Sequence, residues 1–441
     1  MVSAVKSPAV ALVSLGCAKN LVDTEDLLGQ LYNLNFRLVA DPEEADAVIV
    51  NTCGFIQSAI DESVGSIQDM VKLKKSGKVE RVYAMGCYVS RDANAVREAV
   101  PGVDDVFSLK ENERMLSTLK SHFSQVALVG SKPLAGVRPI SATMPHYSYL
   151  KISEGCNRTC TYCTIPSIRG DNVDKSIEDL LTEAQGLARR GVKELNIIAQ
   201  DTTAYGIQRY GQPRLLDLLK ALETVEGIEW LRLLYAYPDH FGDDLVDFIL
   251  KSPKMLNYLE LPIQHASPSV LRRMSRPNTF ELYDRVFSNL RKADPHFALR
   301  TTVIVGFPGE TDEEFEFMLN YCKTRRFDRL GAFKYFREEG TPAARMKDQV
   351  SAEVVEARYD RLMRQQQELH FAANRHWLGK DMAFIVDEVS ASGYEGRGRT
   401  WRDSVEIDAQ IELQSSIPLR PGMIATCRIK KVLEYDLLGV L

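Results

Sequence analysis

The chain has 441 residues, of which 45% are hydrophobic and 26% are charged, and its formal net charge is −5. This composition is that of an ordinary soluble protein, and the length suggests about three domains with a large buried core. The acidic balance argues against a protein that wraps nucleic acid over its whole surface, and it leaves a basic or neutral partner possible. No apolar run reaches the roughly 20 residues of a membrane helix, so we expect no membrane span.

The first predicted element is a buried strand. Pro8 to Gly16, followed by Cys17, has some likeness to a lipoprotein signal. However, Lys6 is the only early basic residue, and Ser14 stands where such a signal needs a large aliphatic residue. We therefore predict a cytoplasmic protein with reduced thiols, which suit metal clusters better than disulfides.

Three apolar, β-branched runs in the first ninety residues each end in a cysteine. They are Val10 to Cys17, Ala47 to Cys53 and Arg81 to Cys87, and helical patterns lie between them near 23–34 and 58–74. This alternation predicts a parallel sheet, in which ligands bind beyond the carboxyl ends of the strands. We therefore expect Cys17, Cys53 and Cys87 at one edge of one sheet as ligands of a cluster, although most free cysteines are simply core residues. Gly16 and Gly86 would let the backbone turn sharply beside a bulky group.

A compact second set of cysteines follows a predicted linker from Ser131 to Pro145. Cys156, Cys160 and Cys163 are spaced C-x3-C-x2-C, with Tyr162 directly before the last cysteine. A structural zinc or a fully ligated cluster needs four protein ligands, so three thiolates leave one metal position open for another molecule. The alternatives are a zinc site completed by a distant fourth ligand, or three unrelated thiols.

The middle of the chain alternates between strand-like and helical patterns. The predicted strands are 147–152, 194–199, 230–235, 258–261, 298–305 and 330–335, and helical patterns include 177–190, 215–226 and 312–325. Six such units predict an open, incomplete version of the eight-unit barrel, with its active face at the carboxyl ends of the strands. Polar residues follow several of these strands, among them Gln200, Asp201, His265 and the turn Gly306 to Glu310.

Several of these residues also have simpler explanations. Thr311 and Glu314 predict a capping box, so the Gly306 to Glu310 turn could be only the start of a helix. His265 could contact a substrate, but a lone histidine at a strand end is at least as often a structural hydrogen-bonding residue. Cys322 and Cys427 lie in amphipathic elements, and we assign both to the core.

A charged helix from Ala352 to Trp377 leads into residues 379–441, whose short strands and turns predict a small β-barrel. This segment carries eight Lys and Arg against ten Asp and Glu. A phosphate-binding surface should be basic, so the balance favours a basic protein partner attracted by Glu395, Asp403, Glu406 and Asp408. The alternative is that the balance only reflects solubility.

The compact triplet resembles the signature of radical S-adenosylmethionine (SAM) enzymes. Together with the dispersed triplet and the C-terminal barrel, it gives almost the whole chain a resemblance to the methylthiotransferases. The segment Ser14 to Glu25, with Ala18-Lys19-Asn20, looks like the branch that acts on the small-subunit ribosomal protein S-twelve, whereas the tRNA-modifying branch typically carries Gln-Met-Asn there. The resemblance implies a methylthiotransferase domain at 7–120 in the form of a parallel α/β sandwich, a radical SAM core at 142–372 and a TRAM barrel at 376–441.

The resemblance also implies the chemistry. Cys156, Cys160 and Cys163 would hold the catalytic 4Fe-4S cluster, and Cys17, Cys53 and Cys87 a second 4Fe-4S cluster. Gln200 and Asp201 would receive the amino group of SAM, and Gly306 and Gly309 would pass close to its adenosine. Two SAM molecules would serve insertion of a methylthio group at the β-carbon of an aspartate, with electrons from a flavodoxin- or ferredoxin-type donor. The sulfur donor is not identified by the sequence. The alternatives are a tRNA adenosine methylthiotransferase and a non-catalytic iron–sulfur or zinc protein that binds RNA.

Overall fold

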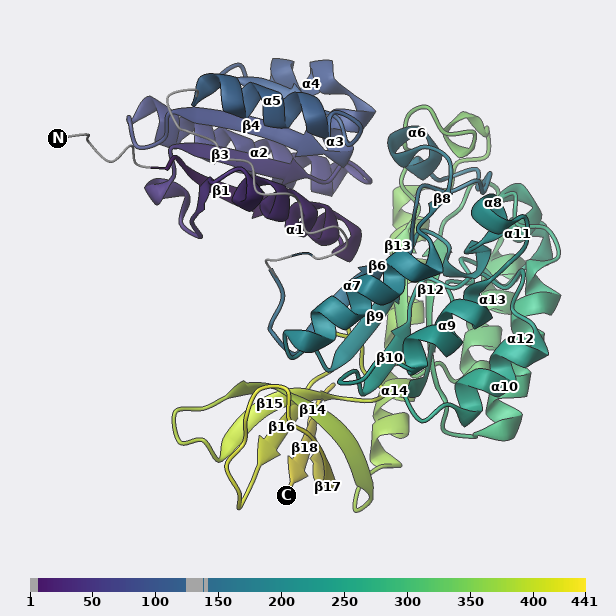
Figure 1. Ribbon diagram of the computed structural model, residues 1–441. Coiled ribbons are helices and arrows are strands. Elements are labelled where there is room, and N and C mark those ends of the chain that lie inside the picture. Colours follow the sequence, from purple (N-terminus) through teal and green to yellow (C-terminus); the bar gives the residue numbers. More distant parts are fainter. Residues whose placement is uncertain (1–6, 124–137, 139–141) are drawn as a thin grey trace. The chain divides into compact units, whose positions relative to one another are not determined.

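A computed structural model describes residues 7–123, 138 and 142–441, and the chain divides into two compact units (Figure 1). The first unit comprises Met1–Ala142, Glu154–Arg158 and Thr164–Asn172. The second comprises Thr143–Ser153, Thr159–Cys163 and Val173–Leu441. Most of the predicted linker from Ser131 to Pro145 lies outside the described residues.

The first unit is built on a five-stranded, entirely parallel sheet with strand order β2-β1-β3-β4-β5. Its strands are β1 (Ala9–Ser14), β2 (Arg37–Leu38), β3 (Ala47–Thr52), β4 (Arg81–Gly86) and β5 (Asp105–Phe107). The three cysteine-terminated runs of the sequence are thus three adjacent strands, and the predicted parallel sheet is confirmed.

Helices cover both faces of this sheet. On one face α1 (Ala18–Asn33) and α5 (Asn112–His122) share a core with Val10 and Ile49. On the other face α2 (Gln57–Lys75), α3 (Cys87–Arg91) and α4 (Ala93–Ala99) pack against Ala11 and Val50. Neighbouring residues of a strand point to opposite faces, so the continuous apolar runs bury both. The unit also contains the short helices η1 (Pro42–Glu44) and α6 (Ile165–Arg169).

The second unit begins with an open six-stranded sheet, also entirely parallel, in the order β13-β12-β11-β10-β9-β6. Its strands are β6 (Tyr147–Lys151), β9 (Glu194–Ile198), β10 (Trp230–Leu233), β11 (Met255–Glu260), β12 (Ala298–Val305) and β13 (Arg329–Lys334). The sheet does not close on itself, which confirms the predicted partial barrel. The strands β7 (Ser153–Glu154) and β8 (Val173–Asp174) form a separate pair.

Helices follow the strands of this sheet along the chain (Figure 1). They are η2 (Thr202–Ala204), α7 (Ile177–Arg189), α8 (Ile207–Tyr210), α9 (Leu215–Glu223), α10 (Asp243–Lys251), α11 (Pro268–Arg273), α12 (Thr279–Ala293), α13 (Asp312–Arg325) and η3 (Ala343–Arg345). The predicted capping box of α13 is present. The side chain of Thr311 accepts a hydrogen bond from the backbone amide of Glu314, and the side chain of Glu314 accepts one from the backbone amide of Thr311. Cys322 of α13 is fully buried in the core, as predicted.

The long helix α14 (Ala352–Arg375) leads into a closed five-stranded barrel, drawn in yellow-green at the end of the chain in Figure 1. Its strands are β14 (Asp381–Val389), β15 (Glu395–Thr400), β16 (Ile411–Gln414), β17 (Ile424–Val432) and β18 (Leu437–Val440). Strand β18 pairs in parallel with β16, while the other neighbouring strands are antiparallel. Cys427 lies in the barrel core, as predicted.

Buried ion pairs join this barrel to the six-stranded sheet. Glu194 of β9 is fully buried and accepts hydrogen bonds from Arg232 of β10 and Arg399 of β15. Although burial alone would raise the pKa of Glu194, the guanidinium groups of Arg399 and Arg232 lower it, so the carboxylate stays charged. The barrel and the sheet therefore form one packed body.

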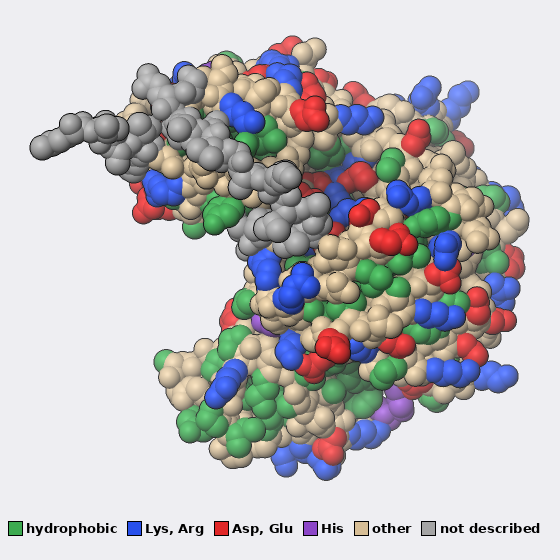
Figure 2. Space-filling view, viewed as in Figure 1, with side chains coloured by type: hydrophobic (Ala, Val, Ile, Leu, Met, Phe, Trp, Pro, Cys, Tyr) green, Lys and Arg blue, Asp and Glu red, His purple; other side chains and the backbone are tan. Residues whose placement is uncertain are grey.

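Packing against the sheet corrects the expectation for two of the four acidic barrel residues that were to attract a basic partner, whereas Glu395 and Glu406 are exposed. Asp403 is buried against Arg329, and Asp408 pairs with Arg300 at a side-chain exposure of 4%. Glu406 accepts hydrogen bonds from the hydroxyl groups of Tyr147 and Tyr149, at 2.9 and 3.2 Å. The exposed charged residues of the barrel number six acidic and six basic (those on the visible face are red and blue in Figure 2), so the excess of acid does not reach its surface.

Candidate functional site

The sheet topology of the first unit brings Cys17, Cys53 and Cys87 to one edge. Cys53 and Cys87 follow directly after β3 and β4, and two residues separate Cys17 from the end of β1. These three strands are neighbours in the sheet. Adjacent strands lie about 4.8 Å apart, so residues at their carboxyl ends are neighbours. Cys17 is also the N-cap residue of α1.

Two glycines make room for this edge. Gly16 has φ +88°, and a Cβ atom there would come within 2.8 Å of the Cβ atom and 2.9 Å of the Sγ atom of Cys53. Gly86 has φ +101°, and its Cβ atom would meet the side chain of Asn51 at 2.2 Å. A residue with a side chain fits neither position without movement, so the predicted need for glycine has a geometric basis.

A buried asparagine ties the three strand ends together. Asn20 of α1 is 1% exposed, and its Nδ2 atom donates to the carbonyl oxygens of Leu15 and Thr52, at 3.0 and 2.9 Å. Its Oδ1 atom accepts from the Sγ atom of Cys87 at 3.3 Å. One side chain therefore fixes the spacing between the ends of β1, β3 and β4.

Arg169 of α6 lies beside the same thiol. Its side chain is 1% exposed, and its guanidinium donates to Asn20, to Asp23 at 3.0 Å and to Glu154 at 2.8 Å. Burial raises the pKa of the Cys87 thiol to about 12, and the charge of Arg169 opposes this rise. Burial likewise raises the pKa of Cys53. Because only thiolates bind metal, occupation of this edge must release protons.

The compact triplet lies on a loop whose parts belong to different units. In the first unit, the amide of Cys156 donates to the carbonyl oxygen of Gly170 at 3.1 Å, and Gly155 has φ +76°. In the second unit, the amide of Cys163 donates to the carbonyl oxygen of Cys160 at 3.1 Å. The guanidinium of Arg276, which is buried, lies 3.9 Å from the Sγ atom of Cys160. All three thiols are partly exposed.

The residues predicted to contact SAM follow strands of the second unit. Gln200 and Asp201 follow Ala199, the first residue after β9, and the Oδ1 atom of Asp201 accepts from Thr203 and Ala204 at the start of η2. Asp201 therefore has a structural role whatever else it binds.

The turn after β12 contains the two predicted glycines. Gly306 and Gly309 have φ +75° and +73°, and a Cβ atom at Gly306 would lie 2.3 Å from Val355 of α14. Packing against Val355 is therefore one reason why this position needs glycine. The amide of Gly306 also donates to the side chain of Glu310 at 3.0 Å. Arg273 donates to the carbonyl oxygen of Gly309 at 2.9 Å, which fixes the second half of the turn.

His265 is a structural residue in this fold. It is fully buried, its Nδ1 atom accepts from the amide of Ser267 at 2.9 Å, and its carbonyl oxygen accepts from Tyr283 at 3.0 Å. Burial and these hydrogen bonds favour the interpretation of His265 as a structural hydrogen-bonding residue.

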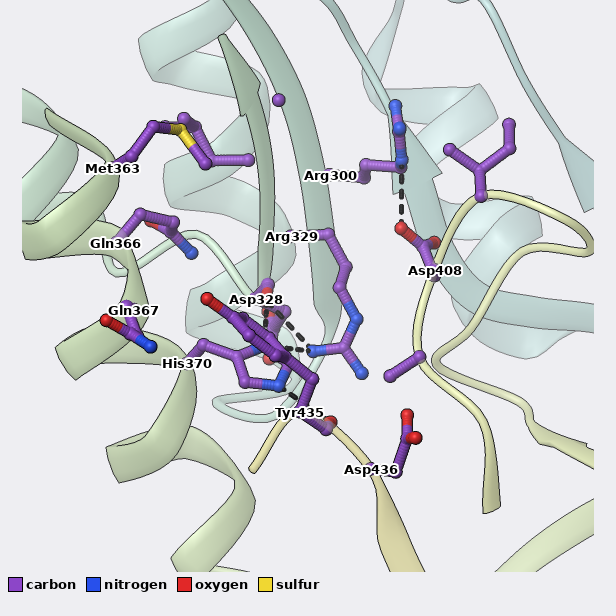
Figure 3. Close-up of a pocket in the computed structure, with 14 residues that line it drawn as sticks. Arg300, Asp328, Arg329, Met363, Gln366, Gln367, His370, Asp408, Tyr435 and Asp436 are labelled. Atoms are coloured by element: carbon purple, nitrogen blue, oxygen red, sulfur yellow. Dashed lines mark hydrogen bonds and ion pairs between the residues drawn. The ribbon is translucent and has the colours of Figure 1, made fainter. Parts of the chain in front are cut away.

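A cavity of about 320 Å³ lies at the end of the six-stranded sheet where β12 and β13 begin, opposite the carboxyl ends of the strands (Figure 3). Met363, Gln366, Gln367 and His370 of α14 line one side, and Asp408, Tyr435 and Asp436 of the barrel line the other. Arg329, the first residue of β13, also lines it, whereas Gln200 and Gly306 follow the carboxyl ends of their strands. Because Arg300 and Arg329 are engaged in ion pairs with Asp408 and Asp403, this cavity is part of the junction between sheet and barrel.

Within residues 7–123, 138 and 142–441, no three His, Cys, Asp or Glu side chains are gathered closely enough to share a single metal ion. The cysteines of a cluster bind different iron atoms, so such ligands need not be gathered in this way. None of the helices in the described part of the chain is long and apolar enough to cross a membrane.

Family models match three parts of the chain. The radical SAM superfamily matches residues 150–322, the uncharacterized protein family UPF0004 matches 9–108, and the TRAM domain matches 378–441. The ribosomal protein uS12 methylthiotransferase RimO of Carboxydothermus hydrogenoformans is 40% identical over 97% of this chain and 98% of its own length. The chain belongs to this family. The RimO protein of Clostridium perfringens strain SM101 is similarly close, with 41% identity over 98% of this chain and 97% of its own length.

Two solved structures resemble this chain in fold. The radical SAM methyltransferase TsrM of Kitasatospora setae, solved with cobalamin and a 4Fe-4S cluster bound, matches with a TM-score of 0.57 at 14% identity, over 77% of each chain. The cobalamin-dependent enzyme OxsB, solved with SAM bound, matches with a TM-score of 0.50 at 13% identity, over 82% of this chain and 56% of that chain. Identities this low relate folds only.

Sequence reasoning missed Asn20, Arg169 and Arg276 as parts of the two cysteine sites. Asn20 lies three residues after Cys17 and within one helical turn of it, a spacing that could have been noticed. Arg169 and Arg276 left no signal, because the thiols that they approach are distant in sequence, 82 residues for Arg169 and 116 for Arg276.

Proposed function

We propose that the protein inserts a methylthio group at the β-carbon of an aspartate in ribosomal protein uS12, using two SAM molecules and two 4Fe-4S clusters. The reaction class and target follow the RimO relatives that the chain matches over almost its whole length. One observation carries the two-cluster proposal: Cys17, Cys53 and Cys87 share a sheet edge in the first unit, separately from the compact triplet.

The donor sets suit iron–sulfur clusters. Each offers three soft thiolates, and Gly16 leaves space directly beside Cys53 that a side chain would fill. Cys156, Cys160 and Cys163 would hold a 4Fe-4S cluster, which would supply the electron for reductive cleavage of SAM. Buried arginines beside Cys160 and Cys87 offset the negative charge that thiolate ligands bring to each set.

We assign the remaining tasks to residues at the carboxyl ends of the sheet. Gln200 and Asp201 would orient the amino group of SAM, and the Gly306 to Gly309 turn would let its adenosine approach the backbone closely. Residues 7–120 would carry the second cluster, 142–372 the radical chemistry, and 376–441 the barrel domain. Since the target is a ribosomal protein, we place the activity in the cytoplasm, with a flavodoxin- or ferredoxin-type protein as electron donor.

The test separates the two cysteine sets in the reconstituted protein. Cys160→Ala should abolish formation of 5'-deoxyadenosine, whereas Cys53→Ala should retain SAM cleavage and lose methylthio transfer. Each variant should lose about half of the iron, because one 4Fe-4S cluster of two is lost. The matched control Cys322→Ala removes a core thiol of α13 and should keep full iron and activity.

Mass spectrometry of uS12 and of tRNA from the same reactions identifies the product. A methylthio group on an aspartate of uS12 is the expected result. Methylthiolated adenosine in tRNA, with unmodified uS12, would reverse the choice of substrate. Full iron retention in Cys53→Ala would reject the second cluster.

A further inference from the structure

Arg169 is an unusual residue to find at a cysteine site, because its guanidinium is almost completely buried. Its side-chain exposure is 1%, and it is paired with Asp23 and Glu154, which are 12% and 32% exposed. A buried charge is stable only when it is paired and hydrogen-bonded. The two carboxylates stand nearer to solvent and hold the cation in the interior, where it meets Cys87.

The contact with the cysteine edge is direct. Arg169 and the Cys87 thiol both donate to the Oδ1 atom of Asn20, so the guanidinium and the thiol share one acceptor, and the charge of Arg169 lowers the pKa of Cys87 against the effect of burial. The same charge acts on Cys53. Arg169 therefore reaches two of the three thiols and the asparagine that joins their strands.

The origin of Arg169 in the chain adds a second observation. It ends α6, six residues after Cys163, yet its side-chain partners include Asn20 and Asp23 of α1. The segment Thr164–Asn172 accordingly belongs to the first compact unit, although the residues directly before it and directly after it belong to the second. The chain that leaves one cysteine set thus contributes a cation to the other.

We propose that Arg169 is a positioning and charge-compensating residue for the cluster held by Cys17, Cys53 and Cys87; the inference rests on the proposed function. A guanidinium in a low-dielectric environment stabilises added negative charge, so it favours the reduced form of a neighbouring cluster. Hydrogen bonds to cysteine sulfur act in the same direction, since they are among the features that set cluster potentials. Through Asn20, the same residue keeps the strand ends at the spacing that the three ligands need.

The first unit offers a matched control for the loss of a buried ion pair. Arg138 is 4% exposed and pairs with Glu25, which is 2% exposed and lies on the same helix α1 as Asn20. Arg138 is not among the main influences on the pKa of Cys53 or Cys87. Arg138→Gln should thus weaken the fold about as Arg169→Gln does, without acting on the cluster.

The experiment measures the N-terminal cluster alone. In the full-length chain with Cys156, Cys160 and Cys163 replaced by alanine, the midpoint potential is followed by electron paramagnetic resonance during reductive titration. Arg169→Gln should lower the midpoint by at least 59 mV, a tenfold change in a one-electron equilibrium. Arg169→Lys keeps the charge and should shift it by less, while Arg138→Gln should leave it unchanged.

The outcomes separate this inference from the proposed function. If the parent variant holds no cluster, the second cluster itself is rejected. If it holds one and Arg169→Gln has the parent midpoint, or Arg138→Gln shifts it equally, the role of Arg169 is rejected. If Arg169→Gln does not retain iron, the lysine variant becomes the test. A retained cluster with the parent midpoint in Arg169→Lys supports the inference. Loss of iron in Arg169→Lys as well overturns the electrostatic role.

Discussion

Replacement of Gly16 by alanine tests the geometry of the N-terminal cysteine edge. The new Cβ atom would lie 2.8 Å from the Cβ atom and 2.9 Å from the Sγ atom of Cys53, so one of the two strand ends must move. Overpacking of this kind costs about 1–3 kcal/mol. The left-handed backbone at φ +88° adds about 1–2 kcal/mol for a residue with a side chain. We therefore expect Gly16→Ala to lose about 2–5 kcal/mol.

Gly77→Ala isolates the contact with Cys53. Gly77 has φ +79°, close to that of Gly16, but nothing lies within 4 Å of a Cβ atom there. This variant should lose only the backbone contribution of about 1–2 kcal/mol. The difference between the two variants, about 1–3 kcal/mol, measures the crowding at Cys53.

The assay must report on the first unit. The three tryptophans, Trp230, Trp377 and Trp401, all belong to the second unit, so their fluorescence is the wrong probe. Hydrogen exchange followed by mass spectrometry gives opening free energies for peptides of β1 and β3. Equal losses in Gly16→Ala and Gly77→Ala would refute the close approach of Gly16 to Cys53.

Three further predictions concern Glu194, Glu314 and Cys322 of the second unit. Glu194→Gln leaves the buried Arg232 without its carboxylate partner, while Arg399 keeps Asp387, and should cost about 3–5 kcal/mol in urea unfolding followed by tryptophan fluorescence, whereas a variant of the exposed Asp247 should change little. Although burial opposes the shift, hydrogen bonds from Arg273 and Ser269 lower the pKa of Glu314 from 4.5 to about 2. The stability advantage of wild type over Glu314→Gln should thus be full above pH 4.5 and shrink as the pH falls toward 2; a constant difference would contradict it. Burial raises the pKa of Cys322 to about 12, so iodoacetamide should modify the exposed Cys17 in the apoprotein and spare Cys322 until the protein unfolds, as peptide mass spectrometry would show.

The arrangement of the N-terminal cysteines could be predicted because it follows from topology. Each run that ends in Cys17, Cys53 or Cys87 is apolar over its length, and parallel strands with helical crossovers place their carboxyl ends at one edge. The start of α1 was placed too late, at Asp23 instead of Ala18, because Cys17 precedes it without a side-chain cap and gives no start signal. The short helix α3, which begins at Cys87 itself, was missed for the same reason.

The charge of the C-terminal barrel could not be interpreted from the sequence. A count of acidic residues treats Asp403 and Asp408 as surface charges, yet their partners Arg329 and Arg300 lie 74 and 108 residues away in the chain. Such pairings depend on how the barrel packs against the sheet, which no local pattern encodes. The placement of Arg169 beside Cys87 depends on tertiary packing in the same way.

The junction between the barrel and the sheet limits how this domain could be exchanged in evolution. Arg232 of the sheet has no exposed surface, and it donates both to Glu194 and to the carbonyl oxygen of Trp401 in the barrel. A barrel transplanted from a distant relative without arginine at the position of Arg399 would leave Glu194 with one of its two guanidinium partners. Recombination in this lineage should therefore have moved the sheet and its barrel together, with the matching arginines and acids inherited as a set.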